Sequence, residues 1–402
     1  MFNYFKIIVL LCIISSLARF SLDSYLPSLP EIGDYFLISD STTQLTLTLY
    51  LLGFSFSQLI YGPLSDRYGR RIVMLVGLSI FALGSFGCAI AGSPELLIAA
   101  RLITGIGAGA CGVLNRAIAS DCFKGAEFSK AWSYTTTTLV ITLSVAPVIG
   151  GYIQQIWDWR TNFILTTLVV GVVFGIIFKY LPETHLNIQK NNLNIKKILQ
   201  DYYSIFMVPS FFAGTLCYTL AFAGLVSYFQ VSPLLFMNQL KLSPAQYGWC
   251  SFIIAANYLL GGIVVNQFAD RLGMKKLLII GALLLISGGL LMCLENFYQH
   301  ATVAAVMFPA AVYVIGARIV IPNAIASAMQ EVRHLNGSSS ALIGFIQMFG
   351  ASLISFAIAS FDNSSSLPLA IFMTILGVMT LVFSVFKNIP KLKTKLADVK
   401  KN

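Results

Sequence analysis

The sequence predicts an all-α membrane protein of twelve transmembrane helices, arranged as two pseudo-symmetric six-helix bundles. Three observations predict this fold class: the composition, a series of twelve apolar runs, and a loop motif that recurs half a chain later. Hydrophobic residues make up 57% of the 402 residues and charged residues only 10%, whereas a soluble protein has about 25% charged residues. This composition leaves too little polar surface for a soluble fold of this size.

The twelve apolar runs are each about 18 to 25 residues long, which is enough for a helix to cross a hydrocarbon core of about 30 Å. We expect them at residues 5–29, 44–62, 72–91, 95–117, 130–152, 161–181, 206–230, 246–267, 277–294, 301–322, 338–360 and 368–386. The first run follows Lys6, as in a signal peptide. It has no clear small-x-small cleavage site and continues to Pro30, so we predict a retained helix.

A short basic stretch bounded by glycines, from Gly62 to Arg71, lies between the second and third runs. A weaker copy runs from Asn266 to Lys276, about half the chain later. A loop repeated at half-length indicates a duplicated architecture. We therefore predict one bundle over 1–181, a polar cytoplasmic linker over 182–205, a second bundle over 206–387 and a basic cytoplasmic tail over 388–402.

Lysine and arginine are distributed unevenly over the predicted loops. With the N-terminus inside, the inner connections hold Arg67, Arg70, Arg71, Lys124, Lys130, Lys190, Lys196, Lys197, Arg271, Lys275, Lys276 and Arg333. The outer connections hold only Arg160 and Lys241. This asymmetry predicts a multi-pass protein with both termini in the cytoplasm. Because the net charge of +10 comes from loop clusters and the tail, we do not expect nucleic-acid binding.

The sequence has no nucleotide-binding loop, metal-ligand cluster or nucleophile–base pair. We therefore expect no enzyme activity and no catalytic, metal or cofactor site. The seven cysteines are scattered without metal-ligand spacing. The stretch from Gly105 to Gly112 resembles a dinucleotide fingerprint, but it lies within an apolar run and predicts close helix packing instead. No feature of the sequence requires an oligomer, so we expect a monomer.

Ionisable residues inside a membrane span are costly, so they are functional candidates by default. Asp23 is the one acid well inside a predicted span. The basic residues inside spans are Arg19, Arg101 and Arg318, with Arg116 at an inner edge.

Asp23 and Arg101 are expected at similar depths, about 10 Å and about 9 Å from the outer ends of their helices at 1.5 Å per residue. We predict that they face one cavity as an ion pair whose protonation can switch. A static structural pair is the alternative. Arg19, four residues before Asp23, lies on the same helical face and is a second possible partner; the alternative is a snorkelling, lipid-facing arginine.

Other polar side chains inside the runs are candidates for a substrate cavity, because such groups should face protein or water in a membrane. Together with two arginines, the candidates are Arg19, Tyr25, Asn115, Gln230, Asn257, Tyr258, Arg318, Asn323 and Gln347. Each could instead have a structural role. In the fifth run, Pro147 predicts a kink, and Gly150 and Gly151 predict close packing against a neighbouring helix.

The stretch from Gly62 to Arg71 resembles the loop motif of the major facilitator superfamily, and its degraded copy between the eighth and ninth helices fits that family across the whole chain. The segments 23–30 and 50–71 resemble the Bcr/CflA-type drug:proton antiporters. Arg101 and its glycines match a fourth-helix motif whose arginine is linked to proton coupling. Pro147, Gly150 and Gly151 match the antiporter motif of the fifth helix, and 181–184 matches the end of the sixth.

The resemblance implies two bundles that rock around a central cavity and export small amphipathic drugs across a bacterial inner membrane in exchange for protons. Asp23 would carry the proton, and Arg101 would tune it. The family's cytoplasmic gate would comprise Gly62, Asp66, Arg67, Gly69, Arg70, Arg71, Asp121, Asp270 and Arg271.

Two features depart from the family pattern. Arg19 and Arg318 are extra cations within spans, which favours an anionic or zwitterionic substrate. The alternative function is therefore a proton-coupled or facilitative transporter of a metabolite such as an amino acid, osmolyte or short peptide. The second loop copy also lacks the glycine and proline, which predicts an asymmetric inner gate.

Overall fold

The computed structural model describes residues 4–185, 195–295, 302–330, 332, 336–361 and 365–386. Within these residues every regular element is a helix. The elements are α1 (Tyr4–Asp23), η1 (Leu26–Ser28), α2 (Leu29–Phe36), α3 (Asp40–Tyr68), α4 (Arg70–Ala89), α5 (Pro94–Cys122), α6 (Gly125–Ile156), α7 (Trp159–Tyr180), α8 (Ile195–Phe206), α9 (Pro209–Pro233), η2 (Leu234–Gln239), α10 (Pro244–Glu295), α11 (Val303–Met329), α12 (Asn336–Ala359) and α13 (Leu367–Phe386).

Eleven of the described helical segments are long and apolar enough to cross a membrane. The long helix α10 contains both the eighth and the ninth predicted spans. Gly273, with φ 70° and ψ 162°, forms a kink between these two spans. Gly69, between α3 and α4, has a similar positive φ of 94°. Glycine adopts this conformation at little steric cost, so the two loop copies turn at corresponding glycines. The predicted all-α membrane fold is confirmed.

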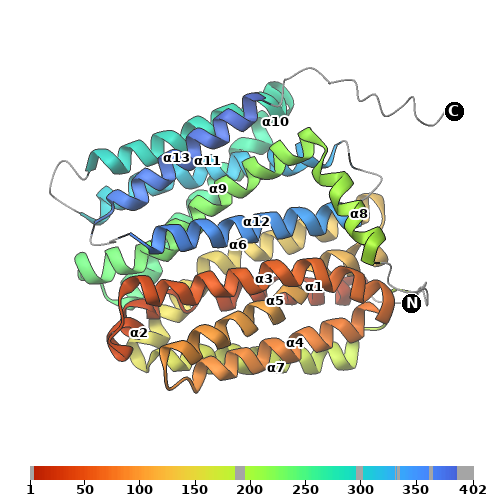
Figure 1. Cartoon of the computed structure of the whole chain (residues 1–402), viewed down its shortest axis with the longest axis horizontal. Helices are drawn as coiled ribbons and strands as arrows, with labels where there is room; N and C mark the ends of the chain where they lie inside the picture. The colour runs from red at the N-terminus through yellow and green to blue at the C-terminus, as the bar shows by residue number, and fades with distance from the viewer. Residues whose placement is uncertain are drawn as a thin grey trace.

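The spans lie roughly side by side along the long axis of the molecule (Figure 1). Helices α1 to α7 form one half and α9 to α13 the other, with α6 and α12 near the middle. We call the end that holds α8 and the start of α1 the proximal end, and the end that holds α2 the distal end. The exact domain boundaries predicted above stay a prediction, and residues 186–194 of the linker and the tail lie outside the described residues.

The first span is broken, whereas its continuous apolar run predicts a single helix. Helix α1 ends at Asp23, and the 3-10 turn η1 joins it to α2. The cause is Pro27, which has no N–H to donate to the carbonyl of Asp23 four residues earlier. Gly150 of α6 accommodates this break, because a Cβ there would overlap the carbonyl oxygen of Ser24. The break places Asp23 at a helix end in the protein interior.

The two halves touch directly at the distal end. A Cβ at Gly151 of α6 would overlap the carbonyl of Pro244 in α10, and one at Gly248 would lie 2.7 Å from the carbonyl oxygen of Pro147. The predicted close packing at Gly150 and Gly151 is therefore present.

Polar side chains add a second distal contact, between α3, α9 and α12. The amide nitrogen of Gln230 donates to Gln44 at 2.7 Å and to the carbonyl of Ser355 at 3.1 Å. The hydroxyls of Thr48 and Ser355 are 2.7 Å apart. All four of these side chains are buried. The two contacts close the distal end of the space between the halves.

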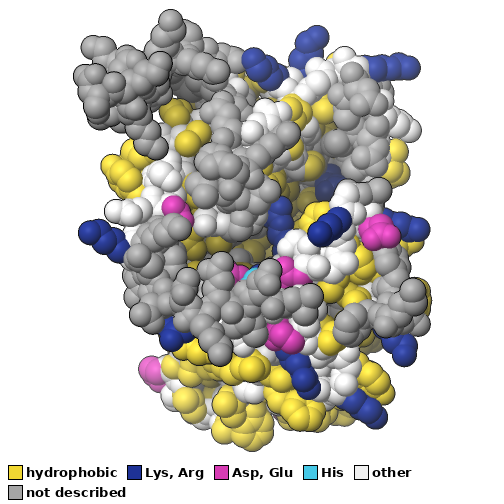
Figure 2. Space-filling model, turned by 90° about the vertical axis from the view of Figure 1, so that its right-hand side faces the viewer, with side chains coloured by type: hydrophobic (Ala, Val, Ile, Leu, Met, Phe, Trp, Pro, Cys, Tyr) yellow, Lys and Arg dark blue, Asp and Glu magenta, His cyan; other side chains and the backbone are white. Residues whose placement is uncertain are grey.

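The proximal end differs in charge and shape. Figure 2 views this end, where Lys and Arg side chains are spread over the face and hydrophobic side chains are visible in a hollow between the two halves.

Candidate functional site

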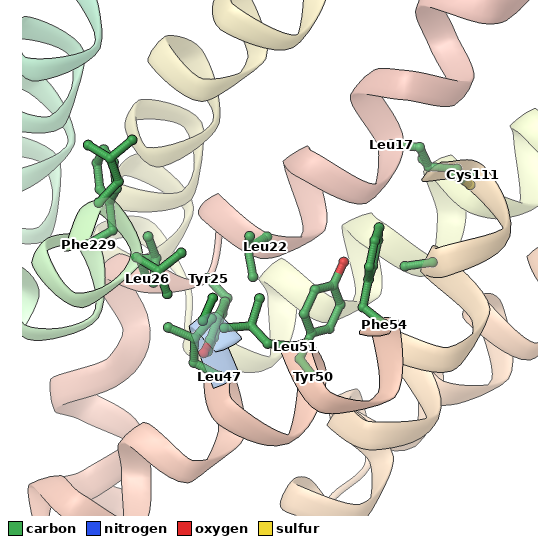
Figure 3. Close-up of a cluster of buried hydrophobic side chains, with 14 of the residues drawn as sticks. Leu17, Leu22, Tyr25, Leu26, Leu47, Tyr50, Leu51, Phe54, Cys111 and Phe229 are labelled. Carbon is green, nitrogen blue, oxygen red and sulfur yellow. The ribbon is translucent and has the colours of Figure 1, made fainter. Parts of the chain in front are cut away.

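A central cavity of about 370 Å³ lies between the halves. It is lined by Ser15, Ala18, Arg19, Leu22, Asp23, Leu26, Leu47, Tyr50, Leu51, Phe54, Gln58, Cys111, Gly112, Asn115, Trp132, Leu139, Val140, Leu143, Tyr218, Phe222, Leu225, Val226, Phe229, Ile254, Ala255, Tyr258, Val314, Ile321, Gln347 and Met348. Figure 3 shows part of this apolar wall, including Leu22 on α1, Tyr50 and Phe54 on α3, and Phe229 on α9. Its volume and apolar lining suit a small organic molecule.

One ion pair lies on the wall of this cavity. The Nε of Arg19 donates to the carboxylate of Asp23 at 2.5 Å, and the two side chains are 20% and 1% exposed. They lie one turn apart on α1, on the same helical face. A carboxylate this deeply buried is tolerated in its ionised form because the guanidinium compensates its charge. Of the two partners predicted for Asp23, the structure selects Arg19.

The predicted ion pair between Asp23 and Arg101 is wrong. Arg101 is fully buried among aromatic rings, with its guanidinium carbon 4.1 Å from the ring centre of Tyr25, 4.5 Å from that of Tyr50 and 5.7 Å from that of Phe163. None of its three guanidinium nitrogens has a hydrogen-bond partner among the described residues. Cation–π attraction therefore stabilises the charge of Arg101.

Tyr50 explains why the pair does not form. Its side chain lines the central cavity with Asp23, while its ring lies against Arg101 and its hydroxyl donates to the carbonyl of Ala18 at 3.0 Å. Arg101 therefore lies behind an aromatic layer and does not reach the cavity wall. Asp23 and Arg101 were expected at similar depths in the membrane, but their side chains do not face the same cavity.

A second polar cluster lies at the proximal end of the first half, around the side chain of Arg70. Arg70 donates to Asp66 at 2.6 Å, to Asp121 at 3.0 Å and to the hydroxyl of Ser65 at 2.5 Å. These bonds join the end of α3, the start of α4 and the end of α5. Three of the predicted gate residues, Asp66, Arg70 and Asp121, are therefore brought together.

Glu183, in the segment after α7, completes this cluster. Its carboxylate accepts the backbone N–H groups of Arg70 at 2.8 Å and Arg71 at 3.2 Å, at the N-terminus of α4, where a negative charge is favoured. A Cβ at Gly69 would overlap this carboxylate. Burial raises the pKa of Tyr202, on the connecting helix α8, to about 12, with the charge of Asp66 as the next cause. The phenol beside the cluster is therefore neutral near pH 7.

Of the other predicted gate residues, Gly69 and the backbone of Arg71 contact Glu183, whereas the side chains of Arg67 and Arg71 bind elsewhere. The guanidinium of Arg67 lies over the ring of Tyr68, and the guanidinium of Arg71 donates a hydrogen bond to the carbonyl of Phe178. Arg271 is exposed, and Gly62 makes no close approach to its neighbours. The side chain of Asp270 lies outside the described residues.

A family model described as Major Facilitator Superfamily matches residues 11–355. The chain belongs to the major facilitator superfamily. As a member of this superfamily it is a membrane transporter and not an enzyme. Among curated proteins, it is 27% identical over 378 residues to multidrug resistance protein D of Escherichia coli, covering 94% of this chain and 93% of that protein. It is 25% identical over 392 residues to a bicyclomycin resistance protein homolog of Haemophilus influenzae, covering 96% and 97%.

These matches confirm the resemblance to Bcr/CflA-type transporters. Among solved structures, a D-xylose-proton symporter superposes with a TM-score of 0.77 at 18% identity, covering 96% of this chain and 97% of that one. At this identity the likeness supports the major facilitator fold alone.

The central cavity of this superfamily member contains four of the nine predicted cavity residues: Arg19, Asn115, Tyr258 and Gln347. Asn257 and Asn323 do not line it, because each donates to the carbonyl four residues earlier in its own helix, at 2.8 Å in both cases. The side-chain amides of both residues therefore bond within their own helices and not to a group in the cavity.

The other three predicted cavity residues are also used elsewhere. Tyr25 lies against Arg101, and Gln230 forms the distal contact between the halves. Arg318 lies with its guanidinium carbon 5.1 Å from the ring centre of Tyr258. Tyr258 therefore lies against Arg318 as Tyr50 does against Arg101.

Several lining residues were missed, notably Gln58, Trp132 and Tyr218. For Gln58 a signal existed, because it continues the helical face of Leu47, Leu51 and Phe54 at spacings of three and four. Trp132 and Tyr218 are aromatic residues in apolar runs, and their local sequence does not distinguish a residue that lines a cavity from one packed in the core.

Proposed function

We propose that this protein is a proton-coupled secondary transporter that exports small amphipathic drugs or toxic compounds across the bacterial inner membrane by alternating access. The observation that carries the proposal is the buried Asp23–Arg19 pair on the wall of an otherwise apolar central cavity. Relatives named for resistance to multiple drugs, bicyclomycin and chloramphenicol support drugs as the substrate class. We expect the protein to act as a monomer.

The proposed orientation puts the proximal end, with both termini, in the cytoplasm. Most described basic residues at the ends of the spans and in their connections lie there, including Arg67, Arg71, Lys124, Lys196, Lys276 and Arg271, and the cytoplasmic side of a membrane protein is enriched in such residues. Since contacts between the halves close the distal end, the state described here is one in which the cavity faces the cytoplasm. This is the state that would receive a substrate for export.

Asp23 is the proposed proton site. In its ionised form it holds Arg19, and protonation removes the charge that binds the two side chains together. Because both line the cavity, the proton changes the charge that a substrate meets there. Arg101 supplies a fixed positive charge behind Tyr50, which is the tuning role proposed for it. Competition between proton and substrate at this wall would couple their movements in opposite directions.

The Arg70 cluster is proposed as part of the cytoplasmic gate. Its bonds join α3, α4, α5 and the segment after α7, all in the first half. This favours movement of the proximal end of that half as one unit when the two halves rock.

Inverted membrane vesicles with an imposed pH gradient and a pH-sensitive dye test this function. Addition of chloramphenicol should release protons in the wild type and not in Asp23→Asn. The matched control is Asp34→Asn, which removes an exposed carboxylate from α2 in the same broken span and should behave as wild type. Proton release that persists in Asp23→Asn would remove Asp23 from the mechanism, and no response to any drug in the wild type would remove the drug-export assignment.

A specific observation favours the alternative, a metabolite transporter. Within the described spans, away from their ends, four arginines (Arg19, Arg101, Arg116, Arg318) accompany one carboxylate, Asp23. An excess of positive charge around a cavity attracts anions. In the same vesicles, proton movement caused by amino acids or short peptides but not by drugs would favour this second function.

A further inference from the structure

A second cavity, of about 850 Å³, lies on the outer surface of the first half between α1, α6 and α7. Its lining includes Ile13 and Leu17 of α1, Lys130, Tyr134 and Thr142 of α6, and Val169 of α7. We call it the α1–α6 groove. It shares no residue with the central cavity, because α6 turns one face, with Trp132, to the cavity and another, with Tyr134, to the groove.

The groove is concave, unlike an ordinary lipid-facing helix surface. Its floor is buried, with Leu17 only 2% and Ala146 0% exposed, whereas its rims are open, with Phe5 70% and Ile141 53% exposed. Along α6 the groove extends from Lys130 to Ala146, which at 1.5 Å per residue is about 24 Å. One leaflet of a bilayer core is about 15 Å thick. The groove therefore has room for an extended acyl chain.

Its charge lies at the proximal end. Lys130 lines the groove, is exposed and makes no ion pair with a described residue, although Glu127 lies one turn before it. Lys6 is also exposed and lies two helical turns before Ile13, on the same face of α1. No Asp or Glu is among the described residues that line the groove. The groove thus combines a long apolar trough with an uncompensated cation at one end.

We propose that the α1–α6 groove binds an anionic phospholipid, with one acyl chain along α1 and α6 and the headgroup phosphate at Lys130 and Lys6. Basic pockets between spans at the cytoplasmic side are suited to acidic headgroups, and each lysine near an anionic lipid surface strengthens binding about fivefold. The site depends on the orientation proposed above, but it is independent of which compound is transported. A lipid bound here packs against α6 on the side opposite the central cavity.

Native mass spectrometry of the full chain, released from bilayers with equal amounts of phosphatidylglycerol and phosphatidylcholine, tests the proposal. Phosphatidylglycerol should be retained preferentially, and Lys130→Gln or Lys6→Gln should each lower the ratio of phosphatidylglycerol-bound to lipid-free protein about fivefold. Lys241→Gln, a lysine at the distal end, is the matched control and should leave occupancy unchanged. Thr142→Phe, which fills the groove, should lower the retention of both lipids.

A second measurement uses the intact protein in bilayers. Tryptophan introduced by Tyr134→Trp should be quenched by brominated phosphatidylglycerol at a lower mole fraction than by brominated phosphatidylcholine. Equal retention and equal quenching by the two lipids would mean ordinary annular lipid and would overturn the proposal. So would unchanged phosphatidylglycerol occupancy in Lys130→Gln, or release of the bound lipid by chloramphenicol, which would make the groove a drug site.

Discussion

Removing the carboxylate of Glu183 should destabilise the proximal end of the first half. This carboxylate accepts four backbone N–H groups, from Arg70 at 2.8 Å, Arg71 at 3.2 Å, and Thr184 and His185 at 3.0 Å each. The first two bonds join the segment after α7 to the start of α4. The change to test is Glu183→Ala, with Glu183→Gln as the conservative variant.

The magnitude follows from these bonds. A hydrogen bond to a charged group contributes about 1.5 to 3 kcal/mol, and a negative charge at a helix N-terminus adds about 0.3 to 1 kcal/mol. Because Glu183 is half-buried and water replaces part of what is lost, we take the lower ends and expect about 2 to 3 kcal/mol for Glu183→Ala. Glu183→Gln keeps one oxygen acceptor and should cost about half as much.

The seven free cysteines provide the assay, because four of them, Cys88, Cys111, Cys217 and Cys250, are buried. A thiol-reactive dye therefore reports unfolding on heating. For a domain of 150 to 250 residues, 1 kcal/mol shifts the midpoint by about 2 to 4 °C, so Glu183→Ala should unfold about 5 to 10 °C below wild type. Glu127→Gln, an exposed carboxylate on α6, is the control. A Glu183→Ala midpoint equal to wild type would refute the reasoning.

Three further predictions test the rest of the site. Gly150→Leu should abolish transport, because its side chain would displace the carbonyl of Ser24 beside Asp23, whereas Gly171→Leu, with nothing within 4 Å of its Cβ, should transport normally in the same drug-efflux assay. Gln230→Ala removes the distal bonds to Gln44 and Ser355 and should increase the labelling of distal cysteine probes several-fold; unchanged labelling would show that these bonds do not hold the distal end closed. Trp132 lines the cavity, so a bound drug should quench the fluorescence of the wild type but quench that of Trp132→Phe less, and equal quenching would place the drug elsewhere.

The sequence predicted the spans well because burial in lipid requires long apolar runs, and few other constraints act on them. The repeat of the loop motif predicted a duplicated architecture, but the turns at Gly69 and Gly273 were seen only in the structure. The break at Asp23 was accessible in principle, since Pro27 removes the bond to the Asp23 carbonyl. Its exact form depends on Gly150 of α6, which is distant in sequence.

The site was predicted less completely, because depth along a helix does not fix which face a side chain occupies. Asp23 and Arg101 were expected at similar depths, yet Tyr50 separates them. Asn257 and Asn323 were reasonable cavity candidates until their bonds to their own helix backbones were known. Glu183 was noted only as the end of a family motif, because its partners are backbone groups that no side-chain pattern reveals.

The distal contact between the halves is made partly by main chain, with Gly151 against Pro244 and Gly248 against Pro147. A seam of this kind leaves no room for larger side chains, so substitutions there should be poorly tolerated. The cavity wall is different, because it is built from many side chains of moderate size, none of which belongs to this seam. The residues that set the substrate range can therefore change without altering the distal contact between the halves, so single substitutions in the cavity wall can extend transport to a new compound while the closure of the distal end is kept.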